Sequence, residues 1–179
     1  MVIELLLLIF LFLYIILRII IGIFFDSKDI ELKKIKKGII FLNKKDFIQA
    51  IIFFDKYILL HPTATYAYTY RAKCQLGLKK YEEAIIDSTI ANTFKETIPE
   101  AFLYKGIAHY KLSQFEKALI ELNKSVRYLK NNADAYKWRG LVNLKLNLIE
   151  KAESDFIKSK DLGDEDSNFI LNHHYLIEI

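Results

Sequence analysis

The chain has 179 residues, of which 53% are hydrophobic and 27% charged, and its formal net charge is +4 at pH 7. This composition excludes a disordered chain, which would be poor in apolar residues, and the few glycines and prolines exclude a collagen-like sequence. The single cysteine, Cys74, excludes both a disulfide framework and a zinc site built on several cysteines, and the small, dispersed positive charge predicts no nucleic-acid partner.

The first predicted element is an apolar helix over residues 2–25. Only Glu4 and Arg18 are charged in this stretch, which as a helix would be roughly 36 Å long, enough to cross a hydrocarbon layer of about 30 Å. Its Leu, Ile, Phe and Val residues favour insertion by about 6–12 kcal/mol, well above the cost of about 3 kcal/mol for Arg18. We therefore predict a single transmembrane helix that acts as a signal anchor.

Two other interpretations of this segment are weaker. A buried core helix is disfavoured, because the rest of the chain is too small to surround a helix that is apolar on every side. A cleaved signal peptide would need a positive first region and small residues at a cleavage site, whereas this segment begins with Glu4 and has no small-residue pair before Asp26.

A short linker is predicted over residues 26–30, and lysines follow the apolar segment. Because positive charge is retained on the cytoplasmic side of a membrane, these lysines place the C-terminal body in the cytoplasm. They would also face anionic lipid there, and a solvated helix face explains them equally well. The residues concerned are Lys28, Lys33, Lys34, Lys36 and Lys37.

The remaining sequence repeats itself with a constant period of 34 residues and no insertion. Alanines mark the period at Ala50, Ala84, Ala118 and Ala152, and small residues stand twelve positions before them at Gly38, Ala72, Gly106 and Gly140. Apolar residues recur at helical spacing in two runs within each unit, separated by a short polar stretch. The units are therefore predicted helix–turn–helix pairs over 31–64, 65–98, 99–132 and 133–166.

This pattern resembles the tetratricopeptide repeat (TPR) family in its small, aromatic and alanine positions. The resemblance covers residues 31–166 and departs from the family pattern at Lys34, which replaces an aromatic residue, and in the terminal proline, which only Pro62 retains. The resemblance implies an α-solenoid of four helix–turn–helix repeats. With the transmembrane helix predicted before it, we expect an all-α fold. The tail, residues 167–179, continues in phase as a capping helix.

In solenoids of this family the first helices of successive repeats line a concave groove. The resemblance thereby assigns groove positions in which aromatic residues recur, and such residues are frequent anchors at protein interfaces. We expect these residues to bind a protein or peptide segment, although they could also pack only against neighbouring helices or receive the chain's own capping helix. The predicted groove residues are Tyr66, Tyr70, Lys73, Tyr104, Ile107, Tyr110, Lys137, Trp138 and Leu141.

The sequence carries no phosphate-binding glycine loop, paired metal ligands or nucleophile elbow, so no catalytic residue, metal or cofactor is predicted. A terminal-carboxylate clamp is also disfavoured, because the corresponding positions lack converging cations. The predicted function is a membrane-anchored adaptor or scaffold that is not an enzyme and that holds a protein partner in its groove. The alternative is a structural or accessory subunit of a cell-envelope or secretion assembly, with the solenoid on the extracytoplasmic side.

Overall fold

Ten α-helices, and no strand, make up the regular structure of the described residues in the computed structural model. It describes the backbone of residues 2–24, 27–94 and 97–174 and the side chains of residues 7–18, 28–94 and 97–171. The chain divides into two compact units, Met1–Lys36 and Lys37–Ile179. The helices are α1 (Val2–Phe24), α2 (Ser27–Asn43), α3 (Phe47–Leu60), α4 (Thr65–Gly77), α5 (Tyr81–Ala91), α6 (Pro99–Lys111), α7 (Phe115–Tyr128), α8 (Ala133–Lys145), α9 (Ile149–Asp161) and α10 (Glu165–His174).

The first unit contains the apolar helix α1. Its described side chains are largely exposed, as at Phe10 and Phe12, which expose 68% and 64% of their surface. Among the described residues, no helix combines the length and the apolar character needed to cross a membrane. Part of the span predicted over 2–25 lies outside the described side chains, namely residues 2–6 and 19–25.

The linker predicted over 26–30 is largely helical, because α2 already begins at Ser27, and only Asp26 lies outside the described residues. Two features of the sequence explain this difference. No proline or glycine interrupts Ser27–Glu31, and Asp29 places a negative charge in the first turn, where it interacts favourably with the helix dipole. The first helix of the first hairpin is therefore longer than its counterparts, with 17 residues against 13 in α4, α6 and α8.

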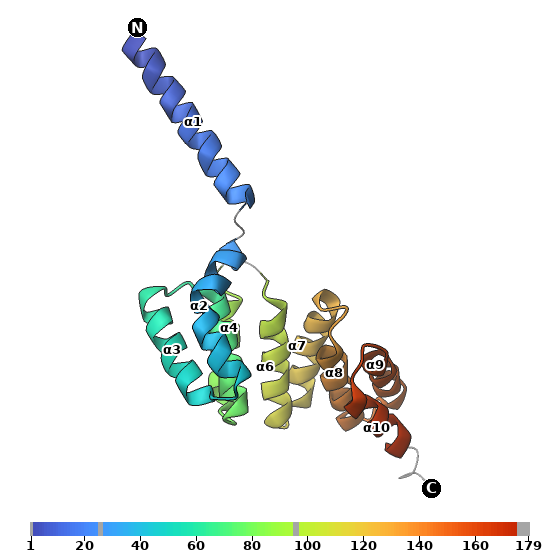
Figure 1. Ribbon diagram of the computed structural model, residues 1–179. Helices are drawn as coiled ribbons and strands as arrows, with labels where there is room; N and C mark the ends of the chain where they lie inside the picture. Colours follow the sequence, from blue (N-terminus) through green and yellow to red (C-terminus); the bar gives the residue numbers. More distant parts are fainter. Residues whose placement is uncertain (1, 25–26, 95–96, 175–179) are drawn as a thin grey trace. The chain divides into compact units, whose positions relative to one another are not determined.

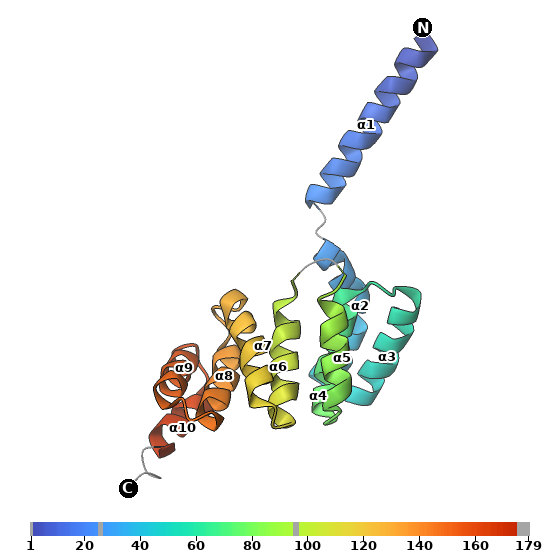
Figure 2. The same ribbon diagram turned by 180° about the vertical axis from the view of Figure 1, so that it is seen from behind.

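The second unit is built from successive helix hairpins. Helices α4, α6 and α8 begin at Thr65, Pro99 and Ala133, the residues at which the sequence period starts each unit. Opposite views show the hairpins α4–α5, α6–α7 and α8–α9 following one another in chain order (Figures 1 and 2). Helix α6 packs against its own partner α7 and against α4, α5 and α8, which produces one continuous core.

Each turn inside a hairpin has the same geometry. One residue adopts a left-handed conformation, with φ between 57° and 60°, at Lys45, Lys79, Ser113 and Asn147. The amide of the next residue then closes the turn onto the end of the first helix, as in the 2.8 Å bond from Lys80 N to Gln75 O. This is a Schellman arrangement, and it satisfies helix carbonyls that would otherwise lack a partner.

The small residues of the sequence pattern lie where two helices approach closely. A Cβ added to Gly106 would lie 2.6 Å from Leu122 Cγ, and one added to Gly140 would lie 2.8 Å from a ring carbon of Phe156. In the second repeat the same two positions hold Ala72 and Ser88, both fully buried. A larger residue on the first helix thus accompanies a smaller one on the second.

The capping helix begins earlier than the predicted residue 167, because Asp164 accepts a 2.8 Å hydrogen bond from Ser167 N and so caps α10. Helix α10 packs against α9. The predicted remainder of the cap, residues 175–179, lies outside the described residues.

Candidate functional site

The second unit has an open groove of about 600 Å³ along its first helices. Its walls come from α4, α6 and α8, and one end is closed by the turn between α2 and α3. The lining residues are Leu42, Asn43, Lys45, Phe47, Lys73, Leu76, Gly77, Glu100, Leu103, Tyr104, Ile107, Lys111, Asn132, Asp134 and Trp138. We call this surface the groove.

Four of the nine predicted groove residues line it: Lys73, Tyr104, Ile107 and Trp138. Tyr104 belongs to the core shared by α6, α7 and α8 and exposes only 9% of its surface. Trp138 is half-buried against the same core, so one side of its indole remains available to the groove. The groove therefore has an aromatic floor fixed by packing.

The other predicted aromatic residues pack beside the groove and do not line it. The ring of Tyr70 stacks on Phe54 at 6.3 Å between centroids, and the ring of Tyr110 meets Trp138 edge-on at 5.5 Å. Tyr66 and Leu141 are half-buried outside the lining. Tyr110 thus supports Trp138 of the floor, whereas Tyr70 connects α4 to α3.

The tyrosines around the groove carry neutral hydroxyl groups at physiological pH. Burial raises the pKa of Tyr104, and the charges of Glu100 and Asp134 raise it further. Burial and Glu100 likewise raise the pKa of Tyr70, and burial raises that of Tyr110.

Lys137, which was also predicted to face a ligand, is occupied within the chain. Its Nζ lies 2.7 Å from Asp164, 3.2 Å from Asp166 and 3.3 Å from Asp134. Burial lowers the pKa of Lys137, but the bond to Asp164 and the three carboxylates outweigh it, and the net shift is upward. Lys137 therefore ties α8 to the start of α10 and does not line the groove.

Three other lysines supply the positive charge of the groove. Lys45, Lys73 and Lys111 are exposed, and none forms an ion pair within the part of the chain that the structure describes. Two of them lie over the aromatic floor, with Lys73 Nζ 5.7 Å from the centroid of the Tyr104 ring and Lys111 Nζ 5.1 Å from that of Trp138. These ammonium groups are free to meet a carboxylate.

Acidic residues lie at the beginnings of α6 and α8. Glu100 lies in the first turn of α6 and Asp134 in the first turn of α8, whereas Lys111 lies in the last turn of α6. This placement matches the dipole of each helix. The groove is therefore polarised, positive toward the hairpin turns and negative toward the beginnings of α6 and α8.

Several lining residues were not predicted as groove residues, because they come from turns and helix ends. Phe47 starts α3, and its ring stands so close to Gly77 that a Cβ there would lie 2.6 Å from a ring carbon. Asn132 caps α8 by accepting a 3.0 Å hydrogen bond from Ala135 N. A helix-face pattern omits such positions. The preference of asparagine for the N-cap was nevertheless a usable signal for Asn132.

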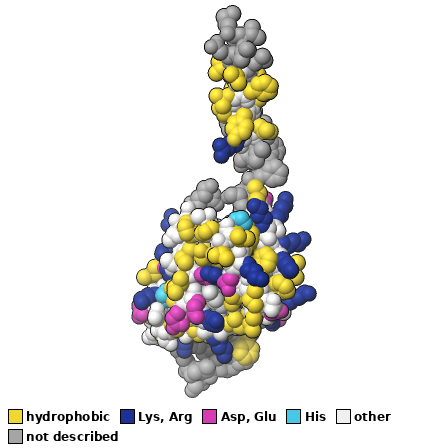
Figure 3. All heavy atoms as spheres, turned by 90° about the vertical axis from the view of Figure 1, so that its left-hand side faces the viewer, with side chains coloured by type: hydrophobic (Ala, Val, Ile, Leu, Met, Phe, Trp, Pro, Cys, Tyr) yellow, Lys and Arg dark blue, Asp and Glu magenta, His cyan; other side chains and the backbone are white. Residues whose placement is uncertain are grey.

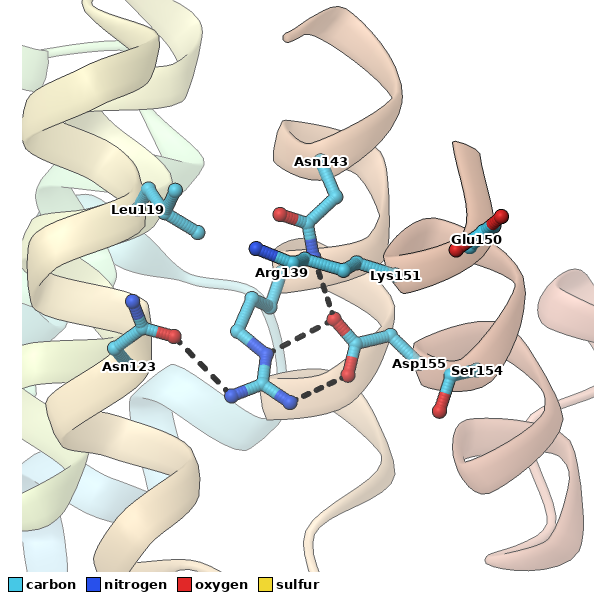
Figure 4. Close-up of a pocket in the computed structure, with 8 residues that line it drawn as sticks. All are labelled: Leu119, Asn123, Arg139, Asn143, Glu150, Lys151, Ser154 and Asp155. Carbon is cyan, nitrogen blue, oxygen red and sulfur yellow. Dashed lines mark hydrogen bonds and ion pairs between the residues drawn. The ribbon is translucent and has the colours of Figure 1, made fainter. Parts of the chain in front are cut away.

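A second cavity, of about 410 Å³, is polar and is crossed by hydrogen bonds between its own lining residues (Figure 4). Arg139 donates to both carboxylate oxygens of Asp155, at 2.9 and 2.6 Å, and to Asn123 at 3.2 Å. Asn143 Nδ2 also donates to Asp155, at 2.9 Å. Because Arg139 and Asp155 neutralise each other and connect α8 to α9, this pair has a structural role, and the groove is the better candidate for binding.

The described residues include neither an activated thiol nor a cluster of metal ligands. Cys74 is fully buried, and burial raises the pKa of its thiol to about 12, against a weaker opposing effect of Lys73. Such a thiol is not activated as a nucleophile. Among the described residues, no cluster of His, Cys, Asp and Glu side chains could hold a metal ion.

The hairpins, their period and the groove define a TPR-like α-solenoid, and solved structures share this fold. TTC0263, a TPR protein of Thermus thermophilus, matches with a TM-score of 0.69 and 21% identity over 83% of this chain and 82% of that protein. YrrB, described as a TPR protein with an unusual peptide-binding site, matches with a TM-score of 0.65 and 20% identity over 86% and 80%.

A third structure was solved with a ligand. The first TPR domain of Spaghetti (RPAP3), bound to the HSP90 peptide SRMEEVD, matches with a TM-score of 0.57 and 21% identity over 60% of this chain and 87% of that one. No protein-family model matches the sequence, and no curated protein matches it either. The comparisons therefore establish the fold, and what the groove binds is addressed below.

Proposed function

We propose that this chain is a membrane-anchored adaptor that binds an extended or helical segment of a partner protein in its groove. The observation that carries the proposal is the set of three lysines without ion pairs among the described residues, Lys45, Lys73 and Lys111, around the floor formed by Tyr104 and Trp138. Aromatic and cationic groups that are fixed but not neutralised are the usual anchors of peptide recognition.

The polarity of the groove specifies the chemistry of the partner. A carboxylate on the bound segment would lie near Lys73 and Lys111, and an apolar side chain would rest against Ile107 and Trp138. A basic side chain would face Glu100, which also forms no ion pair within the described residues. The bound segment is therefore acidic toward one end, apolar in its centre and neutral or basic toward the other.

Two of the similar structures support a binding role for this fold. YrrB is described by its peptide-binding site, and the RPAP3 domain was solved with a peptide bound. By analogy the groove of this chain is the part of the surface where a peptide would lie. A scaffold of this kind acts by holding its partner and needs no catalytic group.

The membrane anchor is the second element of the proposal. It rests on the length and apolar character of residues 2–25 and on the exposed apolar side chains of Leu7–Leu17, which aqueous surroundings would disfavour. The lysines from Lys28 to Lys37 favour a cytoplasmic solenoid. Resistance to alkaline carbonate extraction tests the anchor. Protease access to the solenoid in sealed vesicles tests on which side of the membrane the solenoid lies. An extracytoplasmic solenoid would favour the envelope-assembly alternative.

The groove is tested with a photo-crosslinking residue in the full chain. Placed at Ile107, in the groove, it should give a discrete protein adduct, whereas at Ile157, exposed on α9, it should not. The adduct should disappear in the double variant Lys73→Glu, Lys111→Glu and persist in Lys130→Glu, an exposed lysine outside the groove. An adduct that survives the double charge reversal would contradict the proposed binding mode.

A further inference from the structure

The outward face of α3 is apolar to an unusual degree. Ile48, Ile52, Leu59 and Leu60 expose 60%, 42%, 80% and 74% of their surface. At about 100° per residue the first three of these fall within roughly 40° of one another around the helix axis. They lie opposite the buried stripe of Ala50, Phe54 and Ile58. The two stripes leave α3 apolar both toward the core and toward the surroundings.

Two residues of this face, Ile48 and Leu59, depart from the chain's own repeat, whereas the positions of Ile52 and Leu60 are also apolar and exposed in the second and third repeats, at Ile86, Ile120, Phe94 and Tyr128. The position of Ile48 is occupied by Glu82, Glu116 and Glu150 in the later second helices, all of them exposed. The position of Leu59 is occupied there by Thr93, Arg127 and Asp161. Since the later repeats fold with polar residues at these two places, hairpin packing does not require the aliphatic side chains of Ile48 and Leu59. Figure 3, seen from the side on which α3 lies in Figure 1, shows hydrophobic side chains on this side among basic and acidic ones.

Two lysines and two carboxylates lie around this face. Lys44 and Lys56 are exposed and form no ion pair in the portion of the chain that the structure describes. Of the carboxylates, Asp55 forms a 2.6 Å ion pair with Arg71, and Asp46 caps α3 by accepting a 3.3 Å hydrogen bond from Gln49 N, which leaves its charge in place. The face therefore combines aliphatic side chains with unneutralised ammonium groups.

We infer that the outward face of α3 lies in the interfacial region of a bilayer that contains anionic lipid. Aliphatic side chains flanked by lysines are the chemistry that such a surface selects. A second copy of the chain would be a poorer match, because a two-fold contact between α3 helices would bring the unpaired lysines of both copies together, and Asp55 is already paired with Arg71.

The segment between α1 and the second unit is short enough to keep α3 near the bilayer. Twelve residues separate Phe24, the last residue of α1, from Lys37, the first of the second unit, and ten of them belong to α2. At about 1.5 Å per helical residue and at most about 3.6 Å for each of the others, this segment reaches about 25 Å. An inserted α1 would thus keep the second unit within that distance of the bilayer and raise its effective concentration there. The inference uses the proposed anchor only as this tether.

The experiment places a fluorescent label on the full chain in vesicles of phosphatidylcholine, alone or in equimolar mixture with phosphatidylglycerol. Gln49→Cys carries the label on α3, and Glu83→Cys carries it at the matching position of α5. Cys74 is fully buried and stays unlabelled. Spin-labelled lipid should quench the label at 49 in the anionic vesicles and leave the label at 83 unquenched.

The double variant Ile48→Glu, Leu59→Thr installs the residues of the second repeat and should abolish quenching at 49. The matched variant Ile86→Glu, at an equally exposed isoleucine of α5, should leave it unchanged. Equal quenching at both label positions would overturn the inference, as would a signal that depends on protein density and so reports contact between copies.

Carbonate extraction of the same vesicles tests the anchor independently of the contact between α3 and the bilayer. Quenching at 49 in a chain that carbonate releases would disprove the anchor and support the inference. A retained chain with no quenching at 49 would support the anchor and overturn the inference.

Discussion

Arg139 and Asp155 form a two-point ion pair between α8 and α9, and Arg71 and Asp87 form the same pair between α4 and α5, two repeats earlier. The N···O distances are 2.9 and 2.6 Å in the first pair and 2.7 and 2.7 Å in the second. The intervening repeat has Lys105 and Glu121 at these positions, joined at 3.4 Å. One periodic position thus connects the two helices of three hairpins, with arginine making the tighter connection.

Replacing arginine by lysine at this position should weaken a hairpin. Arg139→Lys keeps the charge but loses the planar fork that meets both oxygens of the buried Asp155, so we expect a loss of about 1–2 kcal/mol in the free energy of unfolding. Urea denaturation measures it. The exposed Arg127→Lys is the matched control and should change stability by less than about 0.5 kcal/mol. Equal effects at the two positions would show that the fork geometry contributes nothing.

Because α6 and α7 approach closely, adding one methyl group at their contact should lower the stability of the chain. Gly106→Ala would place a Cβ 2.6 Å from Leu122 Cγ, and the overpacking should cost about 1–3 kcal/mol even though alanine favours helices by about 1 kcal/mol.

The second repeat supplies the corresponding rescue, because it holds Ala72 and Ser88 at these positions. Leu122→Ser alone should destabilise by removing a buried side chain. The double variant should lose less than the sum of the two single losses. Strict additivity in urea denaturation would contradict the steric explanation.

Much of the fold follows from the sequence because its causes are local and repeated. A constant period places Thr65, Pro99 and Ala133 at equivalent points, and helices begin at all three. The groove was only partly predictable. A helix-face pattern identifies Lys73, Ile107 and Trp138 but not the turn residue Lys45. It does not predict that Lys137 forms an ion pair with Asp164, 27 residues away along the chain, and therefore does not line the groove.

The left-handed turn residues offer a stabilising substitution. Lys79 has φ of 60°, a conformation that glycine adopts without the steric cost of a side chain, so Lys79→Gly should stabilise the chain by about 0.5–1 kcal/mol. Asn147 has nearly the same φ, 58°, but asparagine tolerates this region, and Asn147→Gly should gain less. The order of the two gains in urea denaturation is the test, and a larger gain at position 147 would contradict it.

The attachment of α10 should depend on pH. Burial alone would raise the pKa of Asp164, but its bonds from Lys137 and Ser167 outweigh burial and hold the pKa below the usual value. A carboxyl group with a lowered folded pKa stabilises the fold above its unfolded pKa, and that contribution is lost as the pH falls through the folded pKa. Hydrogen exchange of the α10 amides should therefore accelerate on acidification relative to those of α6.

Charge removal separates this effect from capping. Asp164→Asn retains a side chain able to cap α10 and should weaken the attachment already at neutral pH, by about 1 kcal/mol. Asp166→Asn removes a carboxylate that is 80% exposed and should have almost no effect. Identical exchange rates in the two variants would show that Asp164 does not hold α10.

The groove can be observed directly, because Trp138 is the only tryptophan of the chain and lines it. The decisive measurement is a titration of the full chain in detergent with tryptophan-free peptides, followed by the fluorescence of Trp138. Peptides that carry carboxylates beside an apolar centre should give saturable changes, which the double variant Lys73→Glu, Lys111→Glu abolishes and Lys130→Glu retains. If charge-reversed peptides bind equally well, or if no peptide alters the emission of the folded chain, the groove is not the binding site described above.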